Sequence, residues 1–185
     1  MKPQEMILAL SKGEFDAQLK AVYVTDSAVE LQRARYIDLV NEFVRVFDDE
    51  RDVIITSAPG RTEVCGNHTD HNNGKVLAAA ANLDVIAAVK KTENGVIRLK
   101  SVGFPMDTVD TADLNVQEAE KERSASLIRG VCARLKALGY EVGGFDAVTT
   151  SRVLKGSGLS SSAAFEVLVV TILSHLYNDD AIDPV

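Results

Sequence analysis

One stretch near the end of the chain, residues 153–164, constrains the fold more than any other. It reads Val-Leu-Lys-Gly-Ser-Gly-Leu-Ser-Ser-Ser-Ala-Ala, and an apolar stripe at helical spacing follows it up to Leu176. Gly156 and Gly158 predict a turn that leads directly into the start of a helix. The first turn of a helix has N–H groups without partners and a positive potential. The stretch therefore predicts a cradle for an anion such as a phosphate group.

A second interpretation of the glycine-serine stretch stays open on these residues alone. Serine is a preferred N-cap, so the stretch also fits a flexible loop followed by a capped helix. It lacks the Gly-x4-Gly-Lys-Ser/Thr pattern of P-loop proteins and the third glycine of the dinucleotide fingerprint. A phosphate cradle here would therefore be of another kind.

Length and composition limit the classes of protein to which the chain can belong. Its 185 residues, 46% of them hydrophobic, suffice for one sizeable domain or for part of a larger protein. The net charge of -7 disfavours a nucleic-acid-binding protein, which usually has a basic face. No apolar run is long enough to span a bilayer, and no signal peptide is evident. We expect a soluble, cytoplasmic protein without nucleic-acid or membrane partners, in which Cys65 and Cys132 are buried, reduced thiols.

The hydrophobic periodicity predicts helices first, and then a cluster of strands. Residues 3–47 show helical spacing, and Ser27 with Glu30 forms a capping-box pattern. Ala58-Pro-Gly60 is expected to end the first strand, and Glu93-Asn-Gly95 is expected to form a hairpin turn. The expected strands are 53–57, 61–66, 96–100 and a short one near Thr108, together with 76–81 and 84–90, which would be paired and buried. Because they are rich in alanine, 76–81 and 84–90 could equally form helices.

The last third of the chain alternates between helix and strand. An amphipathic helix is predicted over 123–138 with Gly139 as its stop, and a strand over 145–150 leads into the glycine-serine stretch. The order of elements predicts an α+β fold.

A second cluster of polar residues lies in the segment 60–74, between glycines and apolar strands. Its members are Arg61, Glu63, Asn67, His68, Asp70, His71, Asn72 and Asn73. These side chains supply the donors and acceptors that recognise a hydroxyl-rich small molecule. A metal site at His68, Asp70 and His71 is disfavoured, because sequence neighbours rarely converge on one ion and no distant ligands complete the set. A solvated polar turn stays open as an alternative.

Both clusters resemble motifs of one enzyme family. The string Gly-Ser-Gly-Leu-Ser-Ser-Ser-Ala-Ala is similar to the phosphate-binding motif of the GHMP small-molecule kinases. The segment 60–77 resembles the galactokinase signature, Gly-Arg-x-Asn-x-Ile-Gly-Glu-His-x-Asp-Tyr-x-x-Gly-x-Val-Leu. The positions that agree are Arg61, Gly66, His68, Asp70, Gly74, Val76 and Leu77. Two ordered motifs within residues 52–177 make the chain similar to the galactokinase family.

The resemblance implies a fold and an activity. The fold would be the ribosomal protein S5 domain 2-like N-terminal domain of a GHMP kinase over residues 51–185, preceded by a helical extension over 1–50. The activity would be phosphorylation of galactose, or of a related hexose, at the anomeric hydroxyl, with ATP and Mg²⁺. We expect the protein to bind ATP and the sugar.

The resemblance also implies roles for individual residues. Arg61 would be catalytic, stabilising the transferred phosphoryl group. Asn67, His68 and Asp70 would bind the sugar. The ATP phosphates would lie on Gly156, Ser157, Gly158, Leu159, Ser160, Ser161 and Ser162, and Ser162 would also be the magnesium ligand.

Three positions depart from the galactokinase signature. Glu63 replaces an asparagine, Asn67 replaces a glutamate and His71 replaces a tyrosine. Because Asn67 is neutral, a sugar carboxylate is better tolerated and galacturonate becomes an alternative substrate. If Glu63 restores the lost charge, galactose stays the substrate. A non-catalytic sugar and ATP sensor, and a kinase for another small alcohol, are further alternatives.

Galactokinases are considerably longer than this chain. Their general base, an aspartate downstream of the glycine-serine motif, has no counterpart before Val185. We therefore expect an N-terminal part of a sugar kinase. By itself this part is expected to be largely inactive and prone to self-association.

Overall fold

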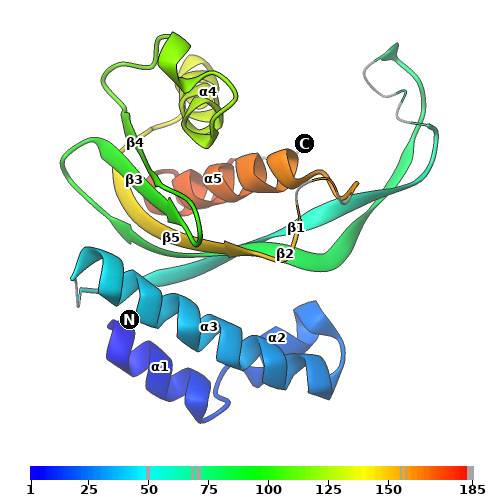
Figure 1. Cartoon of the computed structure of the whole chain (residues 1–185), viewed down its shortest axis with the longest axis vertical. Helices are drawn as coiled ribbons and strands as arrows, with labels where there is room; N and C mark the ends of the chain where they lie inside the picture. Colours follow the sequence, from blue (N-terminus) through cyan, green and yellow to red (C-terminus); the bar gives the residue numbers. More distant parts are fainter. Residues whose placement is uncertain (49–50, 68, 70–71, 155, 157, 183–185) are drawn as a thin grey trace.

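The chain forms a curved sheet with helices on both of its faces (Figure 1). The computed structural model describes residues 1–48, 51–67, 69, 72–154, 156 and 158–182. On one face lie α1 (Pro3–Ser11), α2 (Asp16–Tyr23) and α3 (Asp26–Phe47), and on the other lie α4 (Ser124–Ala137) and α5 (Ser161–Tyr177). A short 3-10 helix, η2 (Glu118–Glu120), precedes α4. The α+β class predicted from the order of elements is confirmed.

The sheet has five strands in the order β1-β2-β5-β3-β4. Their bounds are β1 (Ile54–Cys65), β2 (Leu77–Lys91), β3 (Val96–Ser101), β4 (Met106–Asp110) and β5 (Phe145–Ser151). β3 and β5 pair in parallel and the other neighbours pair antiparallel. The chain passes from β3 to β5 through β4 and α4, so the glycine-serine stretch leaves a central strand and enters α5.

Alternate residues of the central strands fill two cores. Val85, Ala87 and Val89 of β2 belong to the cluster packed against α4 and α5, whereas Ile86 and Ala88 pack against α3. A strand directs successive side chains to opposite faces, so a strand between two helical layers must be apolar on both faces. This explains the continuous apolar run in the second half of β2.

Two expectations about the first two strands were wrong. Pro59 and Gly60 do not end β1, because the strand continues with register shifts between Pro59 and Arg61 and between Glu63 and Cys65. β1 is an edge strand, where a proline at a bulge is tolerated. Residues 76–81 and 84–90 do not pair with each other, because residues 77–91 form one strand that pairs with β1.

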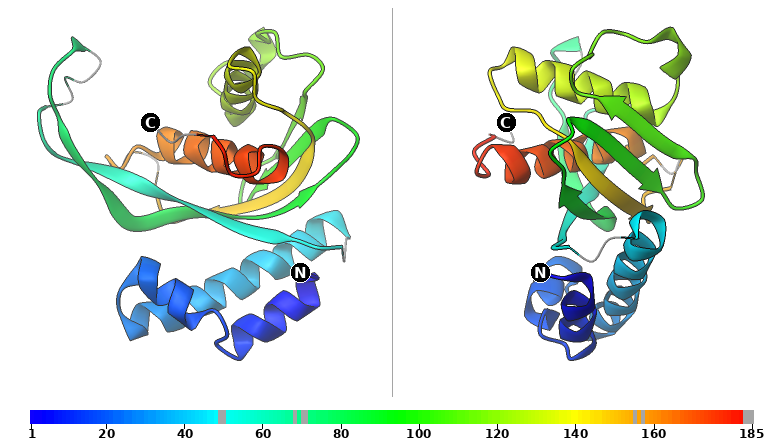
Figure 2. Two further views of the ribbon diagram at one scale, coloured as in Figure 1. Left: turned by 180° about the vertical axis from the view of Figure 1, so that it is seen from behind. Right: turned by 90° about the vertical axis from the view of Figure 1, so that its left-hand side faces the viewer.

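The outer half of the β1–β2 pair forms an arm that reaches beyond the rest of the sheet (Figures 1 and 2). We define the arm as residues 61–65 and 77–81. Val64 and Leu77 are 61% and 57% exposed, and Cys65 is exposed as well. The expected burial of residues 76–81 and of Cys65 is therefore wrong, whereas Cys132 in α4 is buried as expected.

The turn at Asn94 and Gly95 forms, but it does not make a hairpin. The Asn94 side chain accepts a hydrogen bond from the N–H of Val96 at 3.0 Å, and Gly95 has a positive φ. β5 lies between β2 and β3 and pairs with both strands. The local turn residues predicted the reversal of the chain correctly. They could not predict that β5, which follows later in the sequence, would pair with β2 in place of β3.

The helical start of the chain was predicted in outline. α3 begins after Thr25, whose hydroxyl accepts a hydrogen bond from the N–H of Ala28 at 3.2 Å. The capping box expected at Ser27 and Glu30 is therefore wrong by two residues. Within the described part of the chain, no helix is long and apolar enough to cross a bilayer.

Candidate phosphate-binding site

We call residues 153–160, the part of the glycine-serine stretch that precedes α5, the glycine-serine loop. Its two glycines leave the backbone accessible. Gly156 and Gly158 have φ values of +80° and +76°, a region that glycine enters without a steric penalty. A Cβ atom built on either glycine would meet no heavy atom of the described residues within 4 Å, apart from its neighbours in the chain. A bulky ligand can therefore come close to the main chain at both positions.

The strand β1 holds both ends of this loop. The N–H of Arg61 donates a hydrogen bond to the carbonyl oxygen of Leu159 at 3.0 Å. A Cβ on Gly60 would lie 3.1 Å from that carbonyl oxygen and 3.2 Å from the methyl groups of Val153. The close approach of β1 to Val153 and Leu159 thus depends on the missing side chain of Gly60.

Arg61 and the loop line one cavity. Its volume is about 610 Å³. The lining residues are Arg61, Leu154, Gly156, Gly158, Ser160, Ser161, Ser162, Ala163 and Glu166. A guanidinium thus shares a hollow with exposed backbone and with three hydroxyl groups at a helix start. These groups are suited to anionic oxygens, because they combine a fixed positive charge with hydrogen-bond donors.

The start of α5 leaves its N-terminal groups available to a ligand. Ser160 occupies the N-cap with φ +56°, and its side chain makes no capping hydrogen bond. No acidic residue stands in the first turn of α5. The alternative interpretation, a helix capped by a serine side chain, therefore lacks the capping hydrogen bond that would define it. The positive end of the helix dipole faces the cavity that Arg61 lines.

Glu166 also lines this cavity, although it was not among the site residues predicted from the sequence. It stands four positions after Ser162 on α5, so the two side chains share one face of the helix. The spacing from Ser162 was a signal in the sequence that could have found it. A carboxylate and a hydroxyl are both oxygen ligands of the kind that Mg²⁺ binds.

A second cavity, of about 540 Å³, adjoins the first one. Leu154, Ser161 and Ser162 line both cavities. The second cavity also has apolar walls, from Val102 and Phe104 between β3 and β4, Leu127 of α4 and Phe165 of α5. No local sequence pattern indicates this cavity, because its walls come from segments far apart along the chain.

The structure brings Arg61 to the glycine-serine loop, but it does not bring Asn67 there. Asn67 is exposed at the end of the arm with φ +52°, and it is absent from the described lining of both cavities. Thr69 lies nearby, where its hydroxyl donates a hydrogen bond to the Gly66 carbonyl oxygen at 2.8 Å. The predicted sugar ligands His68 and Asp70, the phosphate ligand Ser157 and the candidate metal ligand His71 lie outside the described residues.

Two family models match separate parts of the chain. The galactokinase galactose-binding signature matches residues 41–91, which include β1, the arm and β2. The GHMP kinases N terminal domain matches residues 126–184, which include β5, the glycine-serine loop and α5. The two matches thus cover the two segments that meet at Arg61 and Leu159.

Galactokinases are among the curated proteins that are similar to the chain. The chain is 29% identical to the galactokinase of Clostridium tetani over 80% of its length, which is 37% of that protein. It is 34% identical to the galactokinase of Lactococcus lactis subsp. lactis over 76% of its length, which is 36% of that protein. The chain therefore spans little more than a third of the length of these relatives.

Solved structures of kinases are also similar to the chain. The Lactococcus lactis galactokinase complexed with galactose matches with a TM-score of 0.69 and 30% identity, over 78% of this chain and 37% of that one. The Methanococcus jannaschii mevalonate kinase matches with a TM-score of 0.54 and 20% identity, over 69% of this chain and 41% of that one, which supports the fold alone. The chain belongs to the galactokinase family of the GHMP kinase superfamily, and it contains the N-terminal domain of that superfamily.

Proposed function

We propose that the whole protein transfers the γ-phosphoryl group of ATP to the anomeric hydroxyl of galactose. The observation that carries this proposal is the shared cavity of Arg61 and the glycine-serine loop. The names of the similar proteins point to the same reaction. ATP would be the phosphoryl donor in the cytoplasm, and galactose or a related hexose would be the acceptor.

The phosphates would bind at the glycine-serine loop. The exposed backbone at Gly156 and Gly158 and the start of α5 would hold their oxygens. Arg61 would lie beside the transferred group, where its fixed charge offsets the negative charge of the transition state. The hydrogen bond from the Arg61 N–H to Leu159 fixes the backbone that carries this side chain.

The residues present fit a magnesium ion. Ser162 and Glu166 would hold it, because both line the cavity and both offer oxygen atoms. Among the described residues, no group of three or more histidines, cysteines and carboxylates could hold a metal by itself. This suits Mg²⁺, which usually takes one or two protein ligands together with phosphate oxygens. The ion would supply charge neutralisation between the phosphates.

The second cavity would hold the nucleoside of ATP. Its apolar walls at Val102, Phe104 and Phe165 suit a planar base, and its hydroxyl groups suit a ribose. Because Ser161 and Ser162 line both cavities, a nucleotide can place its base in one and its phosphates in the other.

The sugar would bind near the end of the arm. Asn67, His68 and Asp70 are the proposed contacts with its hydroxyl groups. A neutral amide at Asn67 does not repel a sugar carboxylate, so galacturonate is the second candidate substrate. The general-base aspartate expected downstream of the glycine-serine motif stays a prediction from the sequence.

A steady-state assay of the whole protein tests this function. ADP release is measured with ATP, Mg²⁺ and a panel of galactose, galacturonate, galactosamine and glucose. We expect turnover with galactose. Binding of ATP and galactose without turnover would instead indicate a sensor, and turnover of a non-sugar alcohol alone would indicate another type of GHMP kinase.

A further inference from the structure

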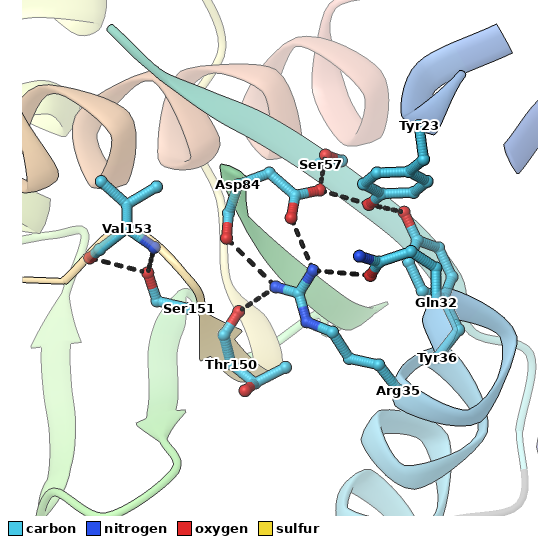
Figure 3. Close-up of polar contacts among 9 residues, drawn as sticks. All are labelled: Tyr23, Gln32, Arg35, Tyr36, Ser57, Asp84, Thr150, Ser151 and Val153. Carbon is cyan, nitrogen blue, oxygen red and sulfur yellow. Dashed lines mark hydrogen bonds and ion pairs between the residues drawn. The ribbon is translucent and has the colours of Figure 1, made fainter. Parts of the chain in front are cut away.

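A buried carboxylate collects three donors between the N-terminal helices and the sheet (Figure 3). Asp84 of β2 is 2% exposed. Its side chain accepts hydrogen bonds from the Tyr23 hydroxyl at 2.5 Å, the Ser57 hydroxyl at 2.6 Å and the Arg35 guanidinium at 2.5 Å. Three segments of the chain thus converge on one residue of β2.

The ion pair of Arg35 and Asp84 also contacts the end of β5, the strand that leads into the glycine-serine loop. The Arg35 guanidinium donates to the carbonyl oxygens of Asp84 and Thr150, both at 3.1 Å. The N–H of Arg152 donates to the carbonyl oxygen of Asp84 at 2.8 Å. Arg35 therefore ties α3 to β2 and β5 at the residues just before the loop.

Two further contacts connect this network to the loop. The Ser151 hydroxyl accepts a hydrogen bond from the N–H of Val153 at 3.0 Å (Figure 3). Val153 is buried and lies against Gly60, beside the strand residue Arg61. The network is thus connected through Thr150, Ser151 and Val153 to the phosphate cavity.

A buried ion pair is weak evidence for a role in stability alone. Removing two charges from water carries a large desolvation penalty, and apolar residues of similar size often stabilise a protein as well or better. An apolar pair, however, could not bond the carbonyl oxygens of Asp84 and Thr150. The planar fork of Arg35 can do so, because it presents several donors in a fixed geometry.

We propose that Arg35 and Asp84 are positioning residues for the glycine-serine loop. Through them the N-terminal helices fix the segment 150–153, and so set the affinity of the loop for a nucleotide. The part that concerns the nucleotide rests on the proposed function. The part that concerns the backbone does not, and it can be measured without a ligand.

Amide hydrogen exchange of the Arg35→Lys variant tests the proposal. Lysine keeps the charge but loses the fork. We expect the amides of Arg152 and Val153 to exchange at least about tenfold faster than in the wild type. The matched control is Arg129→Lys, because Arg129 of α4 is 8% exposed and makes a forked pair with Glu120 of η2 at 2.6 and 2.7 Å.

The control separates positioning from general loss of stability. Arg129→Lys is expected to lower the melting temperature comparably while the two amides change less than about twofold. Equal changes at these amides in both variants would overturn the proposal. If Arg35→Lys does not fold, Tyr23→Phe removes only one donor to Asp84, and about threefold faster exchange at the same amides is expected. No change there in Tyr23→Phe would also overturn it.

Nucleotide binding gives the second measurement. The dissociation constant of Mg²⁺-ADP is expected to rise about tenfold in Arg35→Lys and to stay within about twofold in Arg129→Lys. If exchange changes as expected but affinity does not, Arg35 and Asp84 fix the segment 150–153 without setting the affinity for a nucleotide, and that part of the proposal is overturned. If the wild type binds no nucleotide, the proposed function fails, and the exchange comparison alone decides the positioning of the loop.

Discussion

The N–H of Arg61 and the carbonyl oxygen of Leu159 are joined by a hydrogen bond of 3.0 Å. This bond connects an edge strand to the exit of the glycine-serine loop, between segments distant in the sequence. It places the guanidinium that Arg61 carries beside backbone that Gly156 and Gly158 leave open. The candidate phosphate site thus depends on how closely β1 approaches the loop.

Gly60→Ala is expected to weaken that approach. The new methyl group would lie 3.1 Å from the Leu159 carbonyl oxygen and 3.2 Å from Val153. Crowding of this kind costs about 1–3 kcal/mol, so the melting temperature should fall. Gly130→Ala is the control, because Gly130 lies on an exposed part of α4, where a built Cβ has no described atom within 4 Å other than those of its chain neighbours and the helix backbone. It should stabilise the protein by about 1 kcal/mol. Equal melting temperatures for Gly60→Ala and the wild type would contradict the close packing.

Arg61→Lys is expected to lower kcat for phosphoryl transfer by about a hundredfold or more. Lysine keeps a positive charge but loses the planar fork that fits phosphate oxygens. Arg45→Lys serves as the control, because Arg45 forms an exposed pair with Glu42 on α3. Steady-state kinetics with ATP and galactose measure the effect. An unchanged kcat in Arg61→Lys would show that Arg61 is not a catalytic residue.

Glu166→Gln is expected to weaken the binding of magnesium at the site. The substitution keeps the shape of the side chain but removes one charged oxygen ligand from the cavity. The Mg²⁺ concentration needed for half-maximal activity should rise about tenfold. Glu118→Gln, at an exposed residue of η2, should leave it unchanged. A magnesium titration in which both variants match the wild type would exclude Glu166 as a ligand.

The Cys132 thiol is expected to make stability depend on alkaline pH. Burial raises its pKa from 9.0 to about 12 in the folded protein. The unfolded chain therefore loses this proton first, and stability falls as pH rises from about 9 towards 12. Between pH 9 and pH 10 the wild type should lose about 1 kcal/mol more than Cys132→Ala. Urea unfolding at the two pH values measures the difference, and parallel losses in both proteins would contradict the buried thiol.

The sequence by itself determined the two motifs, the α+β class and most elements. Gly156 and Gly158 indicated a turn before a helix, because glycine alone adopts these φ values readily. The spacing of apolar residues predicted α4 and α5, because a helix repeats its buried face every 3.6 residues. These signals are local, so they can be found without knowing which segments meet.

Only the tertiary structure decided which segments became neighbours. β5 took the place between β2 and β3, the arm stayed exposed, and Arg35 met Asp84 and Thr150. Periodicity shows that a residue faces a neighbour but not which neighbour it is, since partners distant in the sequence leave no local pattern. The candidate site is assembled from such contacts, at Gly60, Arg61 and Leu159.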